Sequence, residues 1–438
     1  LREKALPYMI EAAQLFEHLF ELRDDGFYHA QRGTAYEGWT IMEDACTELA
    51  CGKALFTVLI AALDEADVRH ESRALWEDMR DRIYDIPLVD VDPDVLECEG
   101  DVYRLAVGQF AGETVRGNKV LALGKPIGYD HFVAQYEAIP DRKAPPYRYS
   151  VQIAREMLHS ERLREDHIAT VRYVVPGAHP QANICAVFPA RLIGLKDRGS
   201  ARFDAAVLTA LMSRDEQDTT SGWDPMPIAL CQLGLAKQAE KYLDEYPSSW
   251  QYYNNGFGHY GWNSEFVADQ ISPFRMYPVK DMDTGDSLWL GTWRFRHMGL
   301  EPLGVFTALM NERLFQSADG VFRVAPAISK ERFARFTLHA VGGFVVSAEI
   351  SGGSPRFIHI HSLSGRPVRV ENPWRTAYVG NKAYAERLIA LTIPKGESIL
   401  LTPEQAMPIA CEAIAPQPNK HCRMRPDKHA MLGLPRID

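Results

Sequence analysis

The chain has 438 residues, of which 46% are hydrophobic and 24% charged, a composition typical of a soluble globular protein with a large core. Its net charge of -10 argues against a nucleic-acid partner, and no apolar run suggests a membrane span. Seven scattered cysteines without zinc-binding spacing predict free thiols and a reducing, cytoplasmic location. We expect neither a metal nor a cofactor.

Helical periodicity dominates the first 317 residues. Apolar side chains recur every three or four positions from Leu6 to Phe20, which predicts an amphipathic helix over 2–23. Further helices are expected at 40–65, 69–84, 150–162, 201–213, 226–245 and 302–316. Their lengths suit antiparallel helix pairs, and the segment 95–123 between them has the pattern of a partly extended excursion.

The pattern changes after Ser317. Short β-rich runs separated by Gly, Pro, Ser and Asn occur at 321–324, 336–340, 344–350, 357–361 and 388–393. This spacing predicts an antiparallel β-sandwich over 318–402. The residues from 403 to 438 are proline-rich and aperiodic, which predicts a tail.

Glu301 is the first candidate catalytic residue. It follows an aromatic and cationic run that includes His297, and Pro302 behind it suits the first position of a helix. A helix N-terminus favours an ionised carboxylate, so Glu301 can serve as a general base. The alternative is a surface residue that satisfies unpaired backbone N–H groups.

A second group of candidates lies in the loop 249–263, which mixes aromatic rings, amides and glycines. Ring faces and amide hydrogen bonds together suit the recognition of a sugar. The candidate substrate-binding residues are Trp250, Tyr252, Asn254, Asn255, His259 and Trp262. The alternative is an ordered loop that covers the core.

Glu37 is the second carboxylate candidate. It lies between Tyr36 and Trp39, whose rings would desolvate it and raise its pKa, as a general acid requires. The alternative is an exposed loop residue. Glu265 and Glu113 are further acidic candidates.

Several of these segments together resemble glycoside hydrolase family 95, the α-L-fucosidase and α-L-galactosidase family. The family places its base, an Asp, eleven residues before a Glu that precedes Leu-Leu-Gln-Ser; here Glu301 stands eleven residues before Glu312, and the segment ends in Gln316 and Ser317. Glu37 corresponds to the general acid, although the surrounding Ser-Pro-Glu-Asn motif is lost. Asn183 stands where the family has the last His of a His-rich stretch.

The resemblance implies most of an (α/α)6 barrel over residues 1–317, followed by the β-sandwich at 318–402 and the tail at 403–438. It implies inverting hydrolysis of an oligosaccharide or glycoside, such as an α-L-fucoside or α-L-galactoside, with Glu37 as acid and Glu301 as base. The family's N-terminal β-sandwich and early barrel helices have no counterpart here, so we expect either a fragment or a remodelled relative.

Two alternative functions remain open. One is a carbohydrate-binding relative without catalysis. The other is a polysaccharide lyase, for which His259 and Tyr260 would be the reacting pair. The sequence does not predict an oligomeric state.

Overall fold

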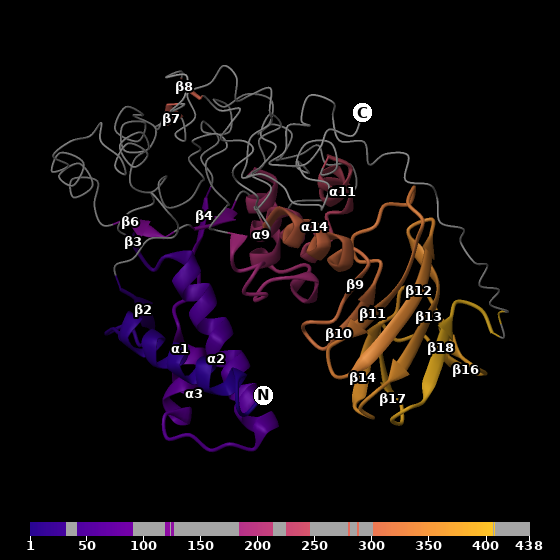
Figure 1. Cartoon of the computed structure of the whole chain (residues 1–438), viewed down its shortest axis with the longest axis horizontal. Helices are drawn as coiled ribbons and strands as arrows, with labels where there is room; N and C mark the ends of the chain where they lie inside the picture. Colours follow the sequence, from indigo (N-terminus) through magenta and orange to yellow (C-terminus); the bar gives the residue numbers. More distant parts are fainter. Residues whose placement is uncertain are drawn as a thin grey trace. The chain divides into compact units, whose positions relative to one another are not determined.

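The computed structural model describes residues 1–31, 42–90, 119–122, 124–126, 184–212, 225–245, 279–280, 287–288, 301–405 and 407, and the structural statements below concern these residues. The chain forms two compact units. The first unit comprises Leu1–Met226 and Trp262–Trp293, and the second comprises Pro227–Gly261 and Arg294–Asp438. Figure 1 shows the elements of both.

Three helices build the described core of the first unit: α1 (Ala5–Leu19), α2 (Cys46–Ala66) and α3 (Arg73–Arg82). Helix α2 packs against both others, and the side chains of Phe56, Leu59 and Trp76 are fully buried. A Cβ at Gly52 would lie 2.8 Å from the Phe20 ring, so only glycine allows the chain to pack this closely. Helix α9 (Ala201–Met212) packs against β5 (Lys119–Leu121) in the same unit.

The predicted helices 2–23 and 40–65 were too long. Helix α1 ends at Leu19, because Phe20 is extended and β1 (Phe20–Leu22) pairs with β2 (Tyr28–Ala30). Helix α2 begins only at Cys46, because β3 (Met42–Glu43) pairs with β6 (Lys125–Pro126). In both places strand pairing overrides a helical apolar pattern.

The remaining short elements of the first unit are β4 (Leu88–Asp90), which pairs with β5, η2 (Leu195–Asp197), and the pair β7 (Val279–Lys280) and β8 (Ser287–Leu288). The predicted helix 150–162 and most of the excursion 95–123 lie outside the described residues. Cys46, Cys185 and Cys231 are free and buried and Cys51 is free and partly buried, as the sequence predicted for these thiols.

Helix α2 is long and apolar enough for a membrane span, with a mean hydropathy of 1.6 over its most apolar window. The expectation that no run approaches such a span was therefore wrong. Of that window, 44% is buried inside the unit, where Leu49, Phe56 and Leu63 contribute to the core. Burial against α1 and α3 accounts for the apolar composition.

Helices α10 (Met226–Gln232), which lies in the second unit from Pro227 onward, and α11 (Ala236–Glu245) replace the single helix that the sequence predicted over 226–245. The break falls at Gly234, whose φ of 77° is incompatible with a continuing helix. Helix α14 (Glu301–Glu312) follows, at the position of the predicted helix 302–316. It ends earlier than predicted, because β9 (Phe315–Gln316) pairs with β10 (Val321–Val324).

Two sheets enclose the core of the second unit (Figure 1). The four-stranded sheet has the order β17-β14-β10-β9, and the six-stranded sheet has the order β11-β12-β13-β18-β15-β16. The remaining bounds are β11 (Ala334–Ala340), β12 (Phe344–Ser351), β13 (Ser354–Ser362), β14 (Pro367–Glu371), β15 (Ala377–Val379), β16 (Lys382–Tyr384), β17 (Leu388–Thr392) and β18 (Ser398–Thr402).

One buried apolar cluster joins both sheets, with Phe322 and Val370 from one and Phe344 and Ile360 from the other. Because one core is common to both sheets, the strands after α14 form a two-sheet β domain. The prediction of a wholly antiparallel arrangement was wrong, because β10 pairs with β14 in parallel. Helices therefore precede a β domain, and the closed helical barrel stays a prediction.

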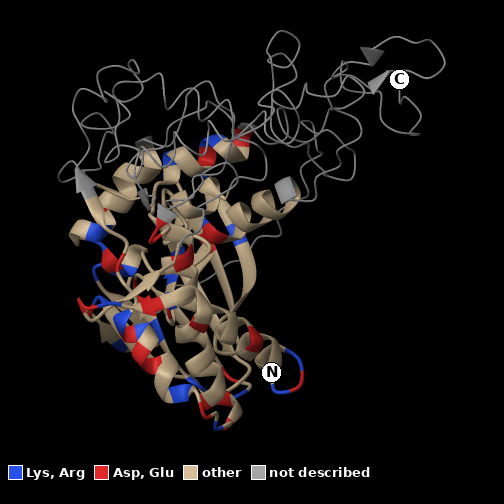
Figure 2. Ribbon diagram, turned by 90° about the vertical axis from the view of Figure 1, so that its left-hand side faces the viewer, with Lys and Arg blue, Asp and Glu red and all other residues tan. Residues whose placement is uncertain are grey.

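Charges of both signs are interspersed over the described elements in the view of Figure 2. Many of them are paired: Arg73 with Asp64 and Glu77, for example, and Arg82 with Asp78. Surface pairs of this kind contribute little to stability individually.

Candidate functional site

The structure places Glu301 at the first residue of α14, and its side chain is not among the described ones. The other predicted site residues lie outside the described residues: Glu37, Asn183, Trp250, Tyr252, Asn254, Asn255, His259, Trp262 and His297. Their proximity to one another is therefore still a prediction. The described contacts near α14 start from the motif at the end of this helix, which includes Arg313, Gln316 and Ser317.

Gln316 links the end of α14 to α10. Its side-chain Nε2 donates to the carbonyl oxygen of Cys231 at 2.8 Å and to that of Glu312 at 3.1 Å. Both acceptors belong to helix ends, whose last carbonyl groups lack intrahelical partners. Ser317 accepts a hydrogen bond from the backbone N–H of Val341 at 3.1 Å. The Gln-Ser ending of the motif thus joins helices to the β-sandwich.

Arg313, also in this motif, is buried beside Glu240 of α11. Its Nη1 lies 3.6 Å from Glu240 Oε1, and the two side chains are each only 8% exposed. Within the described part of the chain, Nε and Nη1 of Arg313 form no hydrogen bond. Burial lowers the pKa of Arg313, although Glu240 opposes this effect. The carboxylate compensates a guanidinium that would otherwise be costly to bury.

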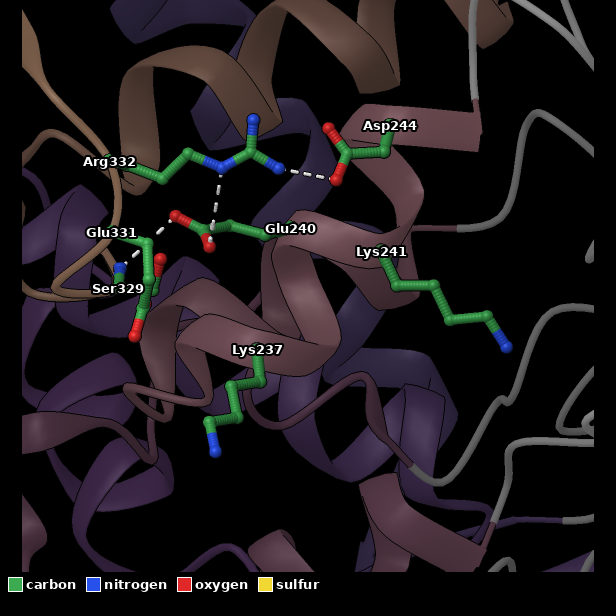
Figure 3. A pocket seen from close by; sticks show the side chains of 7 residues that line it. All are labelled: Lys237, Glu240, Lys241, Asp244, Ser329, Glu331 and Arg332. Carbon is green, nitrogen blue, oxygen red and sulfur yellow. Dashed lines mark hydrogen bonds and ion pairs between the residues drawn. The ribbon is translucent and has the colours of Figure 1, made fainter.

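Glu240 also lines a cleft of about 430 Å³ (Figure 3). Ser329 donates its backbone N–H to Glu240 Oε1 at 3.1 Å, and Arg332 Nε lies 3.7 Å from Oε2. Arg332 also donates to Asp244. The lining residues are Lys237, Glu240, Lys241, Asp244, Ser329, Glu331 and Arg332.

The cleft balances three cationic side chains against three carboxylates. In Figure 3, Glu240, Asp244 and Arg332 point toward one another, whereas Lys237 and Lys241 extend away from this group. Hydrogen bonds from its own backbone and from Ser329 lower the pKa of Glu331. None of the described lining residues is aromatic, so they offer charged hydrogen-bonding groups but no face on which a sugar ring could stack.

In the first unit, His29 is buried between two carboxylates. Its Nδ1 lies 2.8 Å from Asp44 Oδ2 and its Nε2 lies 2.8 Å from Asp25 Oδ2. Asp44 also accepts the backbone N–H of Ala30 at 2.9 Å. The backbone N–H of Phe27, and then His29, lower the pKa of Asp25. With both ring nitrogens engaged, His29 joins residues 25–30 to Asp44 and has no nitrogen left for a ligand.

Comparison with known proteins adds a distant structural similarity. No protein-family model and no curated protein matches the chain. Among solved structures, it is similar to a protein titled "Putative kojibiose phosphorylase from human microbiome", with a TM-score of 0.34 and 11% sequence identity. The match covers 90% of this chain and 46% of that protein, so the chain spans less than half of its length. A similarity at this level does not establish a shared fold.

Sequence reasoning missed the cluster around Glu240. The signal that would have found it is the spacing of Lys237, Glu240, Lys241 and Asp244, which are three and four residues apart within a predicted helix and so share one face. The partners from Ser329 to Arg332 carried no such signal, because they reach α11 only through the tertiary fold.

Proposed function

We propose that the chain processes glycosides, and that it does so as an inverting glycoside hydrolase similar to family 95. The supporting observation is the register of α14: this helix begins at Glu301, the residue that corresponds to the family's base. The unpaired N–H groups at a helix N-terminus favour the ionised form of a carboxylate, which a base requires.

In the proposed reaction, Glu37 protonates the glycosidic oxygen as the bond to the anomeric carbon breaks. Glu301 removes a proton from the water that attacks the opposite face of the sugar ring. An inverting pair needs a separation of about 6.5–9.5 Å between its carboxyl groups. A measured separation above about 12 Å would rule out this pair as the acid and base.

The proposed substrate is an α-L-fucoside or α-L-galactoside. Trp250, Tyr252 and Trp262 would stack on the ring, and the amides of Asn254 and Asn255 would bond its hydroxyl groups. His259, His297 and Asn183 would complete the polar contacts. This assignment rests on the residue types and on the family resemblance.

The test is an assay of the purified full chain on aryl α-L-fucoside, aryl α-L-galactoside and other aryl glycosides, with and without inorganic phosphate. Proton NMR of the first product reports whether the anomeric configuration is inverted. We expect inversion and release of the free sugar in the absence of phosphate. Dependence of turnover on phosphate would contradict hydrolysis and show phosphorolysis instead.

Glu301→Gln should lower kcat by about 10²–10⁴-fold while substrate still binds, because the base is lost but the pocket is preserved. Glu301→Asp should also impair turnover, because it withdraws the carboxylate by about one C–C bond from an attack geometry that tolerates little error. Glu397→Gln, an exposed position in the sandwich, is the matched control. Full activity in Glu301→Gln would assign the base elsewhere, with Glu265 next to test.

The alternative functions give different outcomes. A carbohydrate-binding protein would bind the sugar without turnover, and Trp250→Ala would then weaken binding without loss of thermal stability. A lyase would release an unsaturated product, visible by its ultraviolet absorbance, and would lose activity on replacement of His259 or Tyr260. Equal loss of folding in Trp250→Ala would instead place this ring in the core, where truncation costs about 3–5 kcal/mol.

A further inference from the structure

Two histidines share the outer face of the six-stranded sheet. On β13, Ile358 and Ile360 are fully buried in the sandwich core, and His359 and His361 are only partly buried. Side chains alternate between the two faces of a strand, so both imidazoles lie on the face opposite the core. Their Cα atoms are separated by two residues of extended chain, about 7 Å.

The sheet register fixes the surroundings of each imidazole. Ser398 on β18 lies opposite His361, and its Oγ is 2.9 Å from His361 Nδ1. When Nδ1 carries the proton and donates to this hydroxyl, Nε2 keeps its lone pair for a ligand. Such a hydrogen bond to the second ring nitrogen is the usual support of a metal-binding histidine.

His359 is available as a ligand. Ser347 lies opposite it on β12, but the Ser347 hydroxyl is 2.8 Å from the Thr337 hydroxyl. Within the described residues, neither ring nitrogen of His359 forms a hydrogen bond.

We propose that His359 and His361 form a binding site for a divalent transition-metal ion, with Cu²⁺ preferred over Zn²⁺ and Ni²⁺. Imidazole nitrogens suit all three ions, and a nitrogen site of given geometry binds Cu²⁺ most tightly. The described residues contain no group of three metal-ligating side chains, so water completes the coordination. This site is independent of the proposed glycosidase chemistry.

Nearby groups limit the site to these two ligands. The nearest buried carboxylate on the same sheet, Glu349, is already bonded to Arg335 and Arg356. His339 on β11 lies in the same cross-strand row as His361, with Val345 between them. Two strand spacings separate these histidines by about 10 Å, so His339 is a matched control rather than a ligand.

The test is a titration of the full chain with Cu²⁺. Calorimetry measures the affinity, and electron paramagnetic resonance identifies the ligand atoms. We expect a site with two nitrogen ligands. His359→Ala and His361→Ala should each weaken this site by about tenfold or more, because the second imidazole binds an ion already held nearby. His339→Ala should leave its affinity unchanged.

Because all three positions lie on the outer face of the sheet, each variant should keep the circular dichroism spectrum of the parent. The Cu²⁺ affinity of a His359→Gln variant, which keeps the side-chain bulk but lacks the imidazole, should be reduced as in His359→Ala. The proposal is overturned if both alanine variants bind Cu²⁺ as the parent does, if only one of the two histidines matters, or if His339→Ala weakens the site equally.

Discussion

Two buried glutamates of the second unit each lie between two arginines, but with different geometry. Glu349 on β12 accepts a hydrogen bond from Arg335 Nε at 2.9 Å and another from Arg356. Glu240 on α11 has its guanidinium neighbours at 3.6 and 3.7 Å, beyond the length of a hydrogen bond. One glutamate and two arginines therefore form a hydrogen-bonded clamp in the sandwich (Glu349, Arg335 and Arg356). The same residue types form a looser cluster beside the helices (Glu240, Arg313 and Arg332).

Solvent access explains why the two clusters should respond differently. The side chains of Arg335 and Arg356 are 27% and 46% exposed, so both keep contact with water. Arg313 is 8% exposed and leaves Nε and Nη1 without a hydrogen bond in the described chain. A buried cation of this kind depends on the nearby negative charge, whereas a half-exposed one can be solvated.

The largest effect is expected from Glu240→Ala. This change removes the carboxylate that forms an ion pair with the buried Arg313, so it should lower the free energy of unfolding by about 3–5 kcal/mol. Urea unfolding followed by circular dichroism measures this. In the matched control, Glu240→Met combined with Arg313→Met, both charges are removed and stability should return to within about 1 kcal/mol of the parent. A loss below about 1 kcal/mol in the single variant would show that Arg313 does not depend on Glu240.

Glu349→Gln should cost less, about 2 kcal/mol, because it removes charge-assisted hydrogen bonds but leaves arginines that water can reach. Burial raises the pKa of Glu349, but the hydrogen bonds from Arg335 and Arg356 outweigh this effect and hold its pKa below the ordinary value of a glutamate. Because the pKa of Glu349 is lowered in the folded protein, its contribution to the free energy of unfolding is complete above the unfolded pKa of about 4.3. That contribution is lost as the pH falls through the folded pKa.

The stability difference between the parent and Glu349→Gln should therefore be constant near neutral pH and shrink in acid. Urea unfolding at a series of pH values measures it. A difference that grows as the pH falls would contradict the lowered pKa.

Gly234→Ala addresses the position of the looser cluster. Gly234 has a φ of 77°, which breaks the helix between α10 and α11. This break sets the direction of α11, the helix that carries Glu240 to Arg313. Alanine in this conformation should cost about 1 kcal/mol in urea unfolding. The control is Gly304→Ala in α14, where an added Cβ would meet no atom within 4 Å, so this change should be neutral or stabilising. Equal effects of the two substitutions would show that the break is not set by the glycine.

The smallest effect is expected from Arg356→Ala. Its side chain is 46% exposed, and Glu349 keeps Arg335, so the loss should be about 0.5 kcal/mol. Thermal unfolding at low and high salt checks this, because a surface pair weakens with ionic strength. If Arg356→Ala lowered the free energy of unfolding as much as Glu240→Ala, the clamp would depend on a single partner as strongly as the cluster does.

Much of the described fold could be predicted from apolar periodicity. The strand 321–324 was predicted with the bounds of β10, and helices were predicted at α3, α9 and α14. The errors fall where a distant segment competes with a local pattern, as at Phe20, which leaves a helical pattern to pair with Ala30. Five strands of the second unit were missed: β9, β14, β15, β16 and β18. Each has five residues or fewer, so its apolar pattern is too short to indicate a strand.

The sequence by itself determined the order of helices before a β domain, the free state of the four described thiols, and the start of α14 to within one residue of the predicted Pro302, because these depend on neighbours a few residues apart. Only the tertiary structure decided that Glu240 meets Arg313 and Arg332, and that β10 pairs with β14. Such contacts join residues more than 40 positions apart, and the sequence of either segment alone does not specify its partner. These long-range contacts form when the apolar faces of the helices and strands pack into one core.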